Sequence, residues 1–228
     1  MLINNIDISV FGAKVQNKAP SHKVKKKNIQ WIAGKPIVMG EEEEENSILP
    51  VRILFEANTR DEVDKNISNF LSNTSDCTLI FRNLTNSYKC FYDSHDIEET
   101  GFDQYLFLNI NFLYYEFSPE QEINFTGSVA VMNTGNIEAP VILELTSPSD
   151  FIDLVIEGLS LEPITINHIK ANQTITINSN DGTIKQGTVN KFDDVDMWEF
   201  PKLLLGTNNI RLNRATVKAK LRYNALWS

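Results

Sequence analysis

The sequence predicts a mainly β protein in two strand-rich parts, with one helix in the first part. Short apolar segments of alternating polarity recur along most of the 228 residues, and Asn, Gly, Pro or Ser separates one from the next. Hydrophobic residues make up 42% of the chain and charged residues 22%, which is the balance of an ordinary globular protein. A chain of this length can bury one large core or two smaller ones.

The first half holds the strongest strand patterns. Expected strands have the sequences NIQWIA, KPIVM, VRILFEA, CTLIFR and YKCFYD. The longer QYLFLNINFLYYEF fits an extended strand pair or a strand that is buried on both faces. Between Arg82 and Tyr88, the segment NLTNS fits a hairpin connection.

One segment of the first half has the periodicity of a helix. In TRDEVDKNISNFLSN, Thr59 fits the N-cap position, and Asp61 and Glu62 fall in the first turn, where acids favour the helix dipole. The apolar residues that follow are spaced i, i+4, i+7 and i+8: Val63, Ile67, Phe70 and Leu71. This pattern predicts an amphipathic helix of about four turns.

A polar segment, SPEQEINF, follows Phe117, contains Pro119 and interrupts the strand pattern. It predicts a boundary between domains at residues 1–118 and 119–228. Beyond it, the expected strands are GSVAVMN, VILELT, FIDLVIEG, PITINHI, TITINS and TVKAKLRY, joined by turns such as NTGN, SPSD and SNDG. Several short, evenly spaced strands without a helix predict an antiparallel β-sandwich.

Charge and hydropathy exclude several partners. The net charge of −9 opposes general affinity for a nucleic-acid backbone, which proteins bind through lysine and arginine. No apolar run approaches the ~20 residues that span a bilayer. The opening MLINNIDISVFGAK lacks the basic and apolar regions of a signal peptide. We therefore expect neither a nucleic acid nor a membrane as a partner.

The two cysteines, Cys77 and Cys90, fit reduced thiols on neighbouring strands. A metal site would need more ligands at closer spacing than these cysteines and His95 supply. We expect no metal and no cofactor.

Motifs for catalysis are missing from the sequence. It contains no Gly-x-Ser-x-Gly, no phosphate-binding glycine loop and no His-Glu-x-x-His. Its histidines, His22, His95 and His168, fall in three separate segments, and His168 fits an exposed strand residue. We expect that the protein is not an enzyme.

A cluster of acids beside aromatic residues leaves other interpretations open. The acids are Asp193, Asp194, Asp196 and Glu199. A glycosidase would need two carboxylates about 5–9.5 Å apart across a sugar cleft, with Trp198 and Phe192 as aromatic platforms. A calcium loop would need a turn glycine, which DDVDMWEF lacks. The simplest interpretation is an irregular segment whose aromatic residues and leucines pack on the sandwich while its acids face water.

That interpretation accounts for the unusual stretch KFDDVDMWEFPKLLLGTNNIRL. Phe200-Pro201 cannot continue a helix or a central strand, because proline lacks an N–H and restricts its neighbour. We expect Trp198 and Leu203–Leu205 to be packed as core residues where the chain crosses over the sandwich. Gly206 and the following Thr-Asn-Asn would turn the chain into the next strand, IRLNR.

The same stretch resembles a known family. FPKLLLGTNNIRL and the final KLRYNALW are similar to the C-terminal end of the distal tail proteins of long-tailed siphophages, which have a Phe-Pro-x-Leu, a Gly-x-Asn turn and a closing strand with a final Trp or Tyr. MNTGNIEAPVILELT and INNIDISVFGAKV add to the resemblance. The residues of this structural fingerprint are Trp198, Phe200, Pro201, Leu203, Gly206 and Asn208.

The resemblance implies an N-terminal belt domain that assembles into a hexameric ring, and a galectin-like C-terminal sandwich outside that ring. It implies a structural virion protein at the tail tip of a phage or prophage, made in the bacterial host cytoplasm. The ring would be a baseplate hub that joins the tail tube protein to a tail-associated lysin or tail fibre, with receptor-binding proteins as further partners. Many relatives carry a large sugar-binding insertion, for which this chain has no room.

Two other functions are weighed against this hub. One is a carbohydrate-binding module on the second sandwich, with Trp198 as its stacking platform. The other is a glycosidase that uses the acids of residues 193–199. A sugar platform needs an exposed ring with amides nearby, whereas a ring set among Met197, Phe200 and the leucines fits the core, so the hub is favoured.

A basic and an acidic run stand side by side near the N-terminus. Residues 1–40 carry seven lysines and one acid, Asp7, and the glutamates follow at once. Such runs are usually solvated loops, but a head-to-tail ring needs two different patches that complement each other. The candidate subunit interface is therefore Lys23, Lys25, Lys26, Lys27, Glu41, Glu42, Glu43, Glu44 and Glu45.

Overall fold

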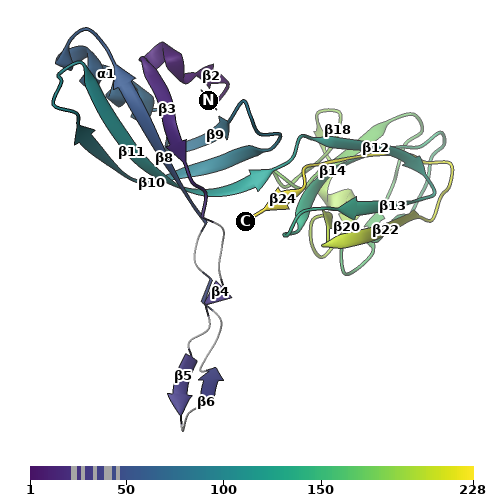
Figure 1. The fold of residues 1–228 in the computed structure, drawn as a ribbon. Helices are drawn as coiled ribbons and strands as arrows, with labels where there is room; N and C mark the ends of the chain where they lie inside the picture. Colours follow the sequence, from purple (N-terminus) through teal and green to yellow (C-terminus); the bar gives the residue numbers. More distant parts are fainter. Residues whose placement is uncertain (22–24, 27–28, 33–34, 39–42, 45–46) are drawn as a thin grey trace. The chain divides into compact units, whose positions relative to one another are not determined.

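The chain divides into two compact units, Met1–Phe117 with Ser228, and Ser118–Trp227. The computed structural model describes residues 1–21, 25–26, 29–32, 35–38, 43–44 and 47–228. Its elements are antiparallel strands and one α-helix, α1 (Arg60–Leu71), which lies in the first unit (Figure 1). The predicted fold class, mainly β with a helix in the first part, is confirmed.

The first unit is built on one antiparallel sheet in the order β2-β1-β9-β10-β11-β8-β3. A 3-10 helix, η1 (Ile8–Phe11), connects β2 to β3. The strands are β1 (Leu2–Ile3), β2 (Ile6–Asp7), β3 (Ala13–Lys18), β8 (Ile48–Glu56), β9 (Asp76–Ile80), β10 (Ser87–Glu99) and β11 (Tyr105–Phe117).

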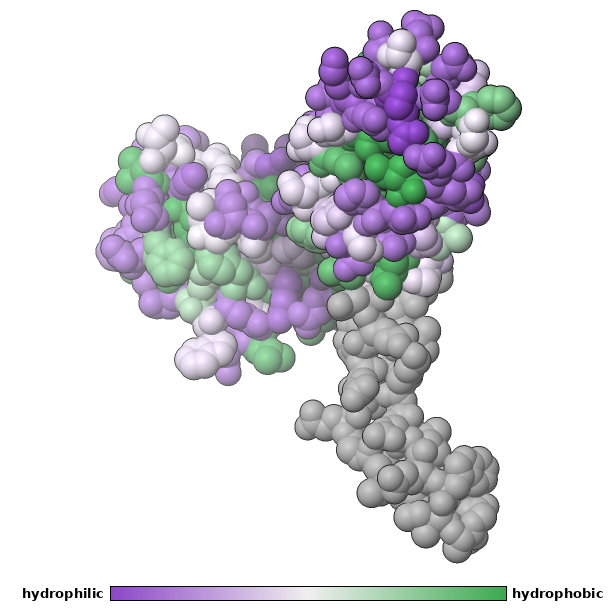
Figure 2. All heavy atoms as spheres, turned by 90° about the vertical axis from the view of Figure 1, so that its left-hand side faces the viewer, coloured by the Kyte–Doolittle hydropathy of each residue, from purple (hydrophilic) through white to green (hydrophobic). Residues whose placement is uncertain are grey.

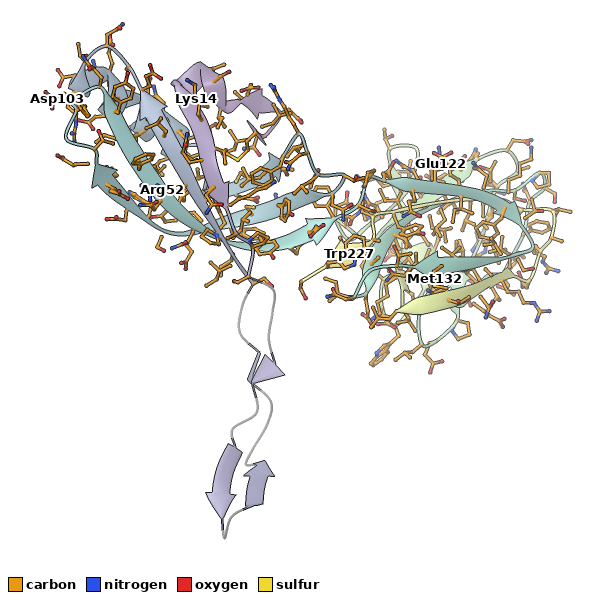
Figure 3. The ribbon with its side chains drawn as sticks, in the orientation of Figure 1. Lys14, Arg52, Asp103, Glu122, Met132 and Trp227 are labelled. Carbon is orange, nitrogen blue, oxygen red and sulfur yellow. The ribbon has the colours of Figure 1, made fainter. Side chains whose placement is uncertain are left out.

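One face of this sheet packs against α1 to form the core of the first unit. Alternate residues of β8 and β11 are buried, because successive side chains of a strand point to opposite faces. Phe55 of β8 meets Phe70 of α1 edge to face, with ring centroids 5.6 Å apart. Phe11 of η1 packs on the other side of Phe70 at 5.9 Å. On the opposite face of the sheet, Arg52 of β8 stays half-buried (Figure 3).

The start of α1 has the predicted cap. The Oγ1 atom of Thr59 accepts a hydrogen bond from the backbone N–H of Glu62 at 3.3 Å, and the Glu62 carboxylate accepts one from the Asn58 N–H at 3.2 Å. Two otherwise unpaired backbone donors are therefore satisfied at the helix start. Val63, Ile67 and Phe70 are the buried residues of the helix, as their spacing predicted.

Cys77 of β9 and Cys90 of β10 lie directly opposite each other in neighbouring strands, and both are free, buried thiols. The sequence-based interpretation of this pair is confirmed.

Two short ladders lie between β3 and β8. β4 (Lys25–Lys26) pairs with β7 (Glu43–Glu44), and β5 (Ile29–Ile32) pairs with β6 (Lys35–Val38). The strands expected in NIQWIA and KPIVM are therefore present.

The second unit contains two antiparallel sheets, in the orders β12-β23-β14-β17-β18-β19 and β13-β22-β15-β16-β20. The first includes β12 (Gln121–Thr126), β14 (Ala139–Thr146), β17 (Thr174–Asn178), β18 (Thr183–Gln186), β19 (Val189–Asn190) and β23 (Lys218–Tyr223), and β21 (Lys202–Leu203) joins β14. The second includes β13 (Ser128–Asn133), β15 (Leu154–Glu157), β16 (Ile164–Ile166), β20 (Val195–Asp196) and β22 (Gly206–Leu212). Two short elements complete the unit, η2 (Phe192–Asp194) and β24 (Leu226–Trp227).

One core cluster draws on both sheets of this unit. Leu143 and Leu221 come from one sheet and Ile156 and Ile210 from the other, and each is at most 1% exposed. The expected sandwich is therefore present.

Within the residues that the structure describes, no helix combines the length and the apolar character needed to cross a membrane.

Candidate functional site

Trp198 lies on the surface of the second unit, where 88% of its area is exposed. The expectation that this indole belongs to the core is wrong. Phe200 and Leu203 take the core positions of the segment instead, with Leu203 fully buried. The chain bends at Trp198 and Glu199, and the Glu199 carboxylate is bonded by the Leu161 N–H and by Lys202.

A second exposed apolar residue, Leu161, lies on the neighbouring loop and is 82% exposed. Its backbone N–H donates to the Glu199 carboxylate at 3.1 Å, and the Lys202 N–H donates to the carbonyl of Leu159 at 2.7 Å. These bonds join the loop after β15 to the loop after β20. Sequence reasoning missed Leu161, because a lone leucine between Ser and Glu gives no periodic signal.

More apolar surface follows at the turn into β22. Leu204 is 38% exposed and Leu205 57% exposed, so only Leu203 of the three leucines packs as expected. Met132 of β13, which pairs opposite Thr207, is 55% exposed (Figure 3). On the face of the molecule drawn in Figure 2, hydrophobic side chains reach the surface between hydrophilic ones.

The turn itself is closed by Asn208. Its side-chain oxygen accepts from the Leu204 N–H at 2.8 Å, while its amide donates to the carbonyls of Leu204 at 2.9 Å and Gly206 at 3.1 Å. Gly206 has φ of 82°, a conformation that glycine adopts without strain. The expected strand IRLNR starts after Asn209, but β22 already begins at Gly206. Asn208, which makes the hydrogen bonds of the turn, is itself a residue of this strand. Pro201, like Asn208, is buried.

Three of the four acids near Trp198 have partners. Asp194 pairs with Lys191 at 2.5 Å, and Asp196 accepts from the Asn167 amide at 3.2 Å. Glu199 pairs with Lys202 at 2.8 Å. The hydrogen bond from Lys202, reinforced by the Leu161 N–H, holds the pKa of Glu199 below its ordinary value. A carboxyl with a lowered pKa is a poor general acid, which weighs against the glycosidase interpretation.

No group of three or more metal-ligating side chains lies together in the described parts of the chain. His95 is bonded through Nδ1 to the Tyr92 hydroxyl at 2.7 Å, and His168 is exposed with φ of 61°. His22 lies outside the described residues.

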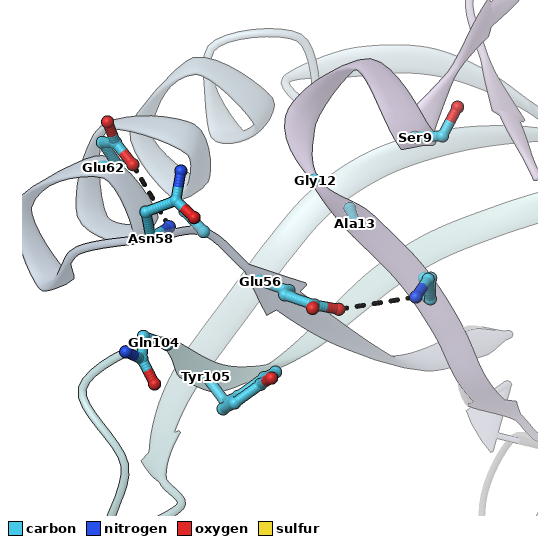
Figure 4. A pocket seen from close by; sticks show the side chains of 10 residues that line it. Ser9, Gly12, Ala13, Glu56, Asn58, Glu62, Gln104 and Tyr105 are labelled. Carbon is cyan, nitrogen blue, oxygen red and sulfur yellow. Dashed lines mark hydrogen bonds and ion pairs between the residues drawn. The ribbon is translucent and has the colours of Figure 1, made fainter.

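The first unit has a polar groove of about 620 Å³ beside the start of α1 (Figure 4). Two of its charged groups pair, with Lys14 Nζ 3.4 Å from Glu56 Oε2, while Glu62 accepts a hydrogen bond from the backbone N–H of Asn58. Gly12 closes one wall so tightly that a Cβ there would lie 2.4 Å from the Glu56 carbonyl oxygen. The groove joins three distant segments, so the sequence could not reveal it.

Besides the edge at β2, the described sheet of the first unit has open edges at β10 and β3, which differ in charge. β9 pairs with β10 only as far as Phe91, and in the described residues no strand pairs with β10 beyond that point on this side. The free edge carries Asp93, Asp96, Glu98 and Glu99, all exposed. At the other end of the sheet, β3 pairs only with β8 and carries Lys14 and Lys18.

Four of the predicted interface residues lie on the β4–β7 ladder. In backbone register, Lys25 stands opposite Glu44 and Lys26 opposite Glu43 within one chain. The remaining candidates, Lys23, Lys27, Glu41, Glu42 and Glu45, lie outside the described residues. Contact with a neighbouring subunit stays a prediction for the whole set.

No family model matches the chain, and no curated protein sequence matches it. Solved structures do. The crystal structure of the SPP1 Dit protein, described as a paradigm of the hub adsorption apparatus in phages that infect Gram-positive bacteria, matches with a TM-score of 0.77 and 12% identity over 100% of this chain and 98% of that chain.

Structures of the phage p2 baseplate in its activated conformation also match. The structure with Sr gives a TM-score of 0.57 at 12% identity, and the structure with Ca gives 0.56 at 13%. Each match covers 95% of this chain and 92% of the other. The chain therefore has the Dit fold along its full length, as the resemblance in its C-terminal segment implied.

Proposed function

We propose that the protein is a structural component of a phage or prophage tail, where a homohexameric ring of it forms the baseplate hub at the distal end. The end-to-end match with SPP1 Dit carries this proposal, because the alignment covers 100% of one chain and 98% of the other. Neither chain has a domain without a counterpart. The first unit would be the ring-forming belt, and the second a galectin-like domain outside the ring.

In this role the ring connects the tail tube protein on one side to a tail-associated lysin or tail fibre on the other. Receptor-binding proteins are further partners, and the location is the virion tail tip. The role is structural rather than catalytic, in keeping with acids such as Asp194 and Glu199 that are held by lysines.

The open edges of the first unit support assembly into a ring. An unpaired strand edge is a template for a strand of another chain. A head-to-tail ring needs two different complementary patches, and here the acidic edge of β10 and the basic edge of β3 differ in both position and charge. We propose that β3 of one subunit lies along the free edge of β10 in the next.

We also keep the lysine and glutamate runs as part of the subunit interface. Because Lys25 and Lys26 stand opposite Glu44 and Glu43 in backbone register within one chain, contacts to a neighbour would add to this pairing. Exposed ion pairs contribute only about 0–1 kcal/mol each, so these charges would mainly direct orientation and on-rate.

The test is mass photometry of the full chain. We expect a species of six times the 25.9 kDa subunit, and slower assembly at high salt. Asp93→Lys with Asp96→Lys, which reverses two of the four charges on the free edge, should shift the distribution towards smaller species. A matched control, Glu162→Lys with Asp193→Lys, makes the same change of net charge at exposed sites of the second unit and should assemble normally.

A wild-type chain that stays monomeric at all salt concentrations would overturn the ring. If both double variants assemble as the wild type does, the ring stands and the edge arrangement is wrong. Reversal of Glu41–Glu45 to lysine tests the remaining candidates in the same way.

A further inference from the structure

The exposed indole of Trp198 is the feature of the second unit that ring formation leaves unexplained. Burying a large apolar side chain stabilises a protein by roughly 1.5–3 kcal/mol, yet Trp198 is 88% exposed and Leu161 beside it 82% exposed. Contiguous exposed apolar surface marks interaction sites, and the Leu161 N–H bonds to Glu199, the residue that follows Trp198.

The two loops that carry these side chains are anchored. Leu161 N–H to Glu199, Lys202 N–H to Leu159 and the Glu199–Lys202 ion pair tie the loops together. Behind them, Phe200 packs against the core. A platform held in this way loses little conformational entropy when a ligand binds.

The chemistry next to the indole is that of carboxylate and amide groups. Asp196, two residues before Trp198, is exposed and held by the Asn167 amide at 3.2 Å. A carboxylate has about four acceptor positions, so Asp196 keeps acceptors for other donors. Hydroxyl groups are such donors, and an aromatic face suits the flat C–H face of a pyranose ring.

Charge narrows the class of ligand. Asp193, Asp196 and Glu162 are exposed acids on these segments, and the nearby Lys202 is already shared by Glu199 and Glu138. These acids would repel an anionic glycan. They would also repel a nucleic acid, because a protein binds its phosphates through lysine and arginine side chains. Association of this surface with a second copy of itself is also disfavoured, because a twofold axis would bring the acids of the two copies face to face.

We propose that the loops at residues 158–163 and 197–200 form a binding site for a neutral saccharide, which stacks on Trp198 and donates hydroxyl hydrogen bonds to Asp196. This site goes beyond the hub function. A sugar ring on each subunit of an oligomer would gain avidity even where each single site is weak.

The test uses the full chain on an array of neutral and anionic oligosaccharides, followed by titration of each hit with tryptophan fluorescence. We expect binding to neutral sugars. Trp198→Ala should weaken it by about tenfold or more, the loss that removal of a stacking ring brings in other ring-stacking sites. Trp198→Phe keeps an aromatic ring and should retain most of the affinity. Because this variant lacks the Trp198 indole, its affinity is measured by calorimetry.

Leu205→Ala is the matched control, because it removes an exposed apolar side chain of the same unit, 57% exposed, outside the two loops. It should bind as the wild type does. All variants should melt as the wild type does, since no core side chain is changed.

Three results would overturn the site: no neutral sugar binds, anionic glycans bind better than neutral ones, or Trp198→Ala binds as well as the wild type. If no sugar binds, and a purified tail protein binds the wild type but not Trp198→Ala, the surface is a protein-binding site instead. Hexamer formation is measured separately, so loss of sugar binding with an intact ring leaves the hub function standing.

Discussion

The two units bury their cores in different ways. In the first, α1 covers one face of a single sheet. The opposite face has half-buried residues such as Arg52 and Phe107, and Arg52 Cζ lies 4.1 Å from the centroid of the Phe107 ring. In the second, two sheets share one core cluster, so the most exposed apolar side chains, Trp198 and Leu161, lie on loops. The first unit thus offers strand edges and a sheet face to other copies, while the second offers anchored loops to a ligand.

The largest expected effect is a loss of stability in one unit that leaves the other unchanged. Phe70→Ala should lower the free energy of unfolding of the first unit by about 3–5 kcal/mol, because the ring is fully buried against Phe55 and Phe11. Hydrogen exchange by mass spectrometry would show faster exchange in residues 47–117 and no change in residues 118–227. Equal acceleration in both parts would mean that the units do not hold separate cores.

The next prediction contrasts two residues of one segment. Leu203→Ala should cost about 2–5 kcal/mol, since Leu203 is 0% exposed. Trp198→Ala should change stability by no more than about 0.5 kcal/mol, because its indole is in solvent. Urea titration of both variants measures the difference. A comparable loss in the two would place the indole in the core after all.

A smaller effect concerns the loop that carries Leu161. Gly158 has φ of 87°, and a Cβ there would lie 2.2 Å from the Asn209 carbonyl oxygen. Gly158→Ala should therefore cost about 1–3 kcal/mol and move the loop. Gly187, with φ of 61° and open space around it, is the control, and Gly187→Ala should cost only about 1 kcal/mol. Equal melting temperatures would show that the loop is not held at Gly158.

The weakest effect comes from the buried thiols of the first unit. The hydrogen bond with Cys77, together with burial, raises the pKa of Cys90. Above the unfolded pKa of about 8.5 the unfolded chain loses this proton while the folded chain keeps it, so stability falls as pH rises from there. Cys90→Ser should flatten this decline in urea titrations between pH 8 and 10. A thiol reagent that labels both cysteines rapidly in the folded protein would contradict the buried pair.

Sequence patterns predicted the elements whose side chains alternate between core and solvent. β8, β11, β14 and β17 and the cap at Thr59 follow directly from such alternation or from local hydrogen bonding. The extension of β10 through SHDIEE was missed, because a strand that is exposed on both faces has no apolar period. β3, in AKVQNK, was missed for a related reason, since an edge strand carries few apolar residues.

The candidate surfaces depend on contacts between residues far apart in the sequence, which sequence patterns do not predict. Glu199, the neighbour of Trp198, bonds to Leu161, which lies 38 residues away in the sequence. Composition around Trp198 favoured the core, whereas the structure leaves the indole 88% exposed. The charges of the β10 and β3 edges are visible in the sequence, but the free edge of β10 depends on where β9 ends, and that of β3 on its place at the end of the sheet.

The most direct test of the account compares the mass in solution of the full chain with that of residues 118–227 alone. The account predicts a hexamer for the full chain, and a monomer with a single cooperative melting transition for the second unit, because the open edges belong to the first. A second unit that forms the oligomer by itself, or a full chain that never exceeds 25.9 kDa, would contradict it.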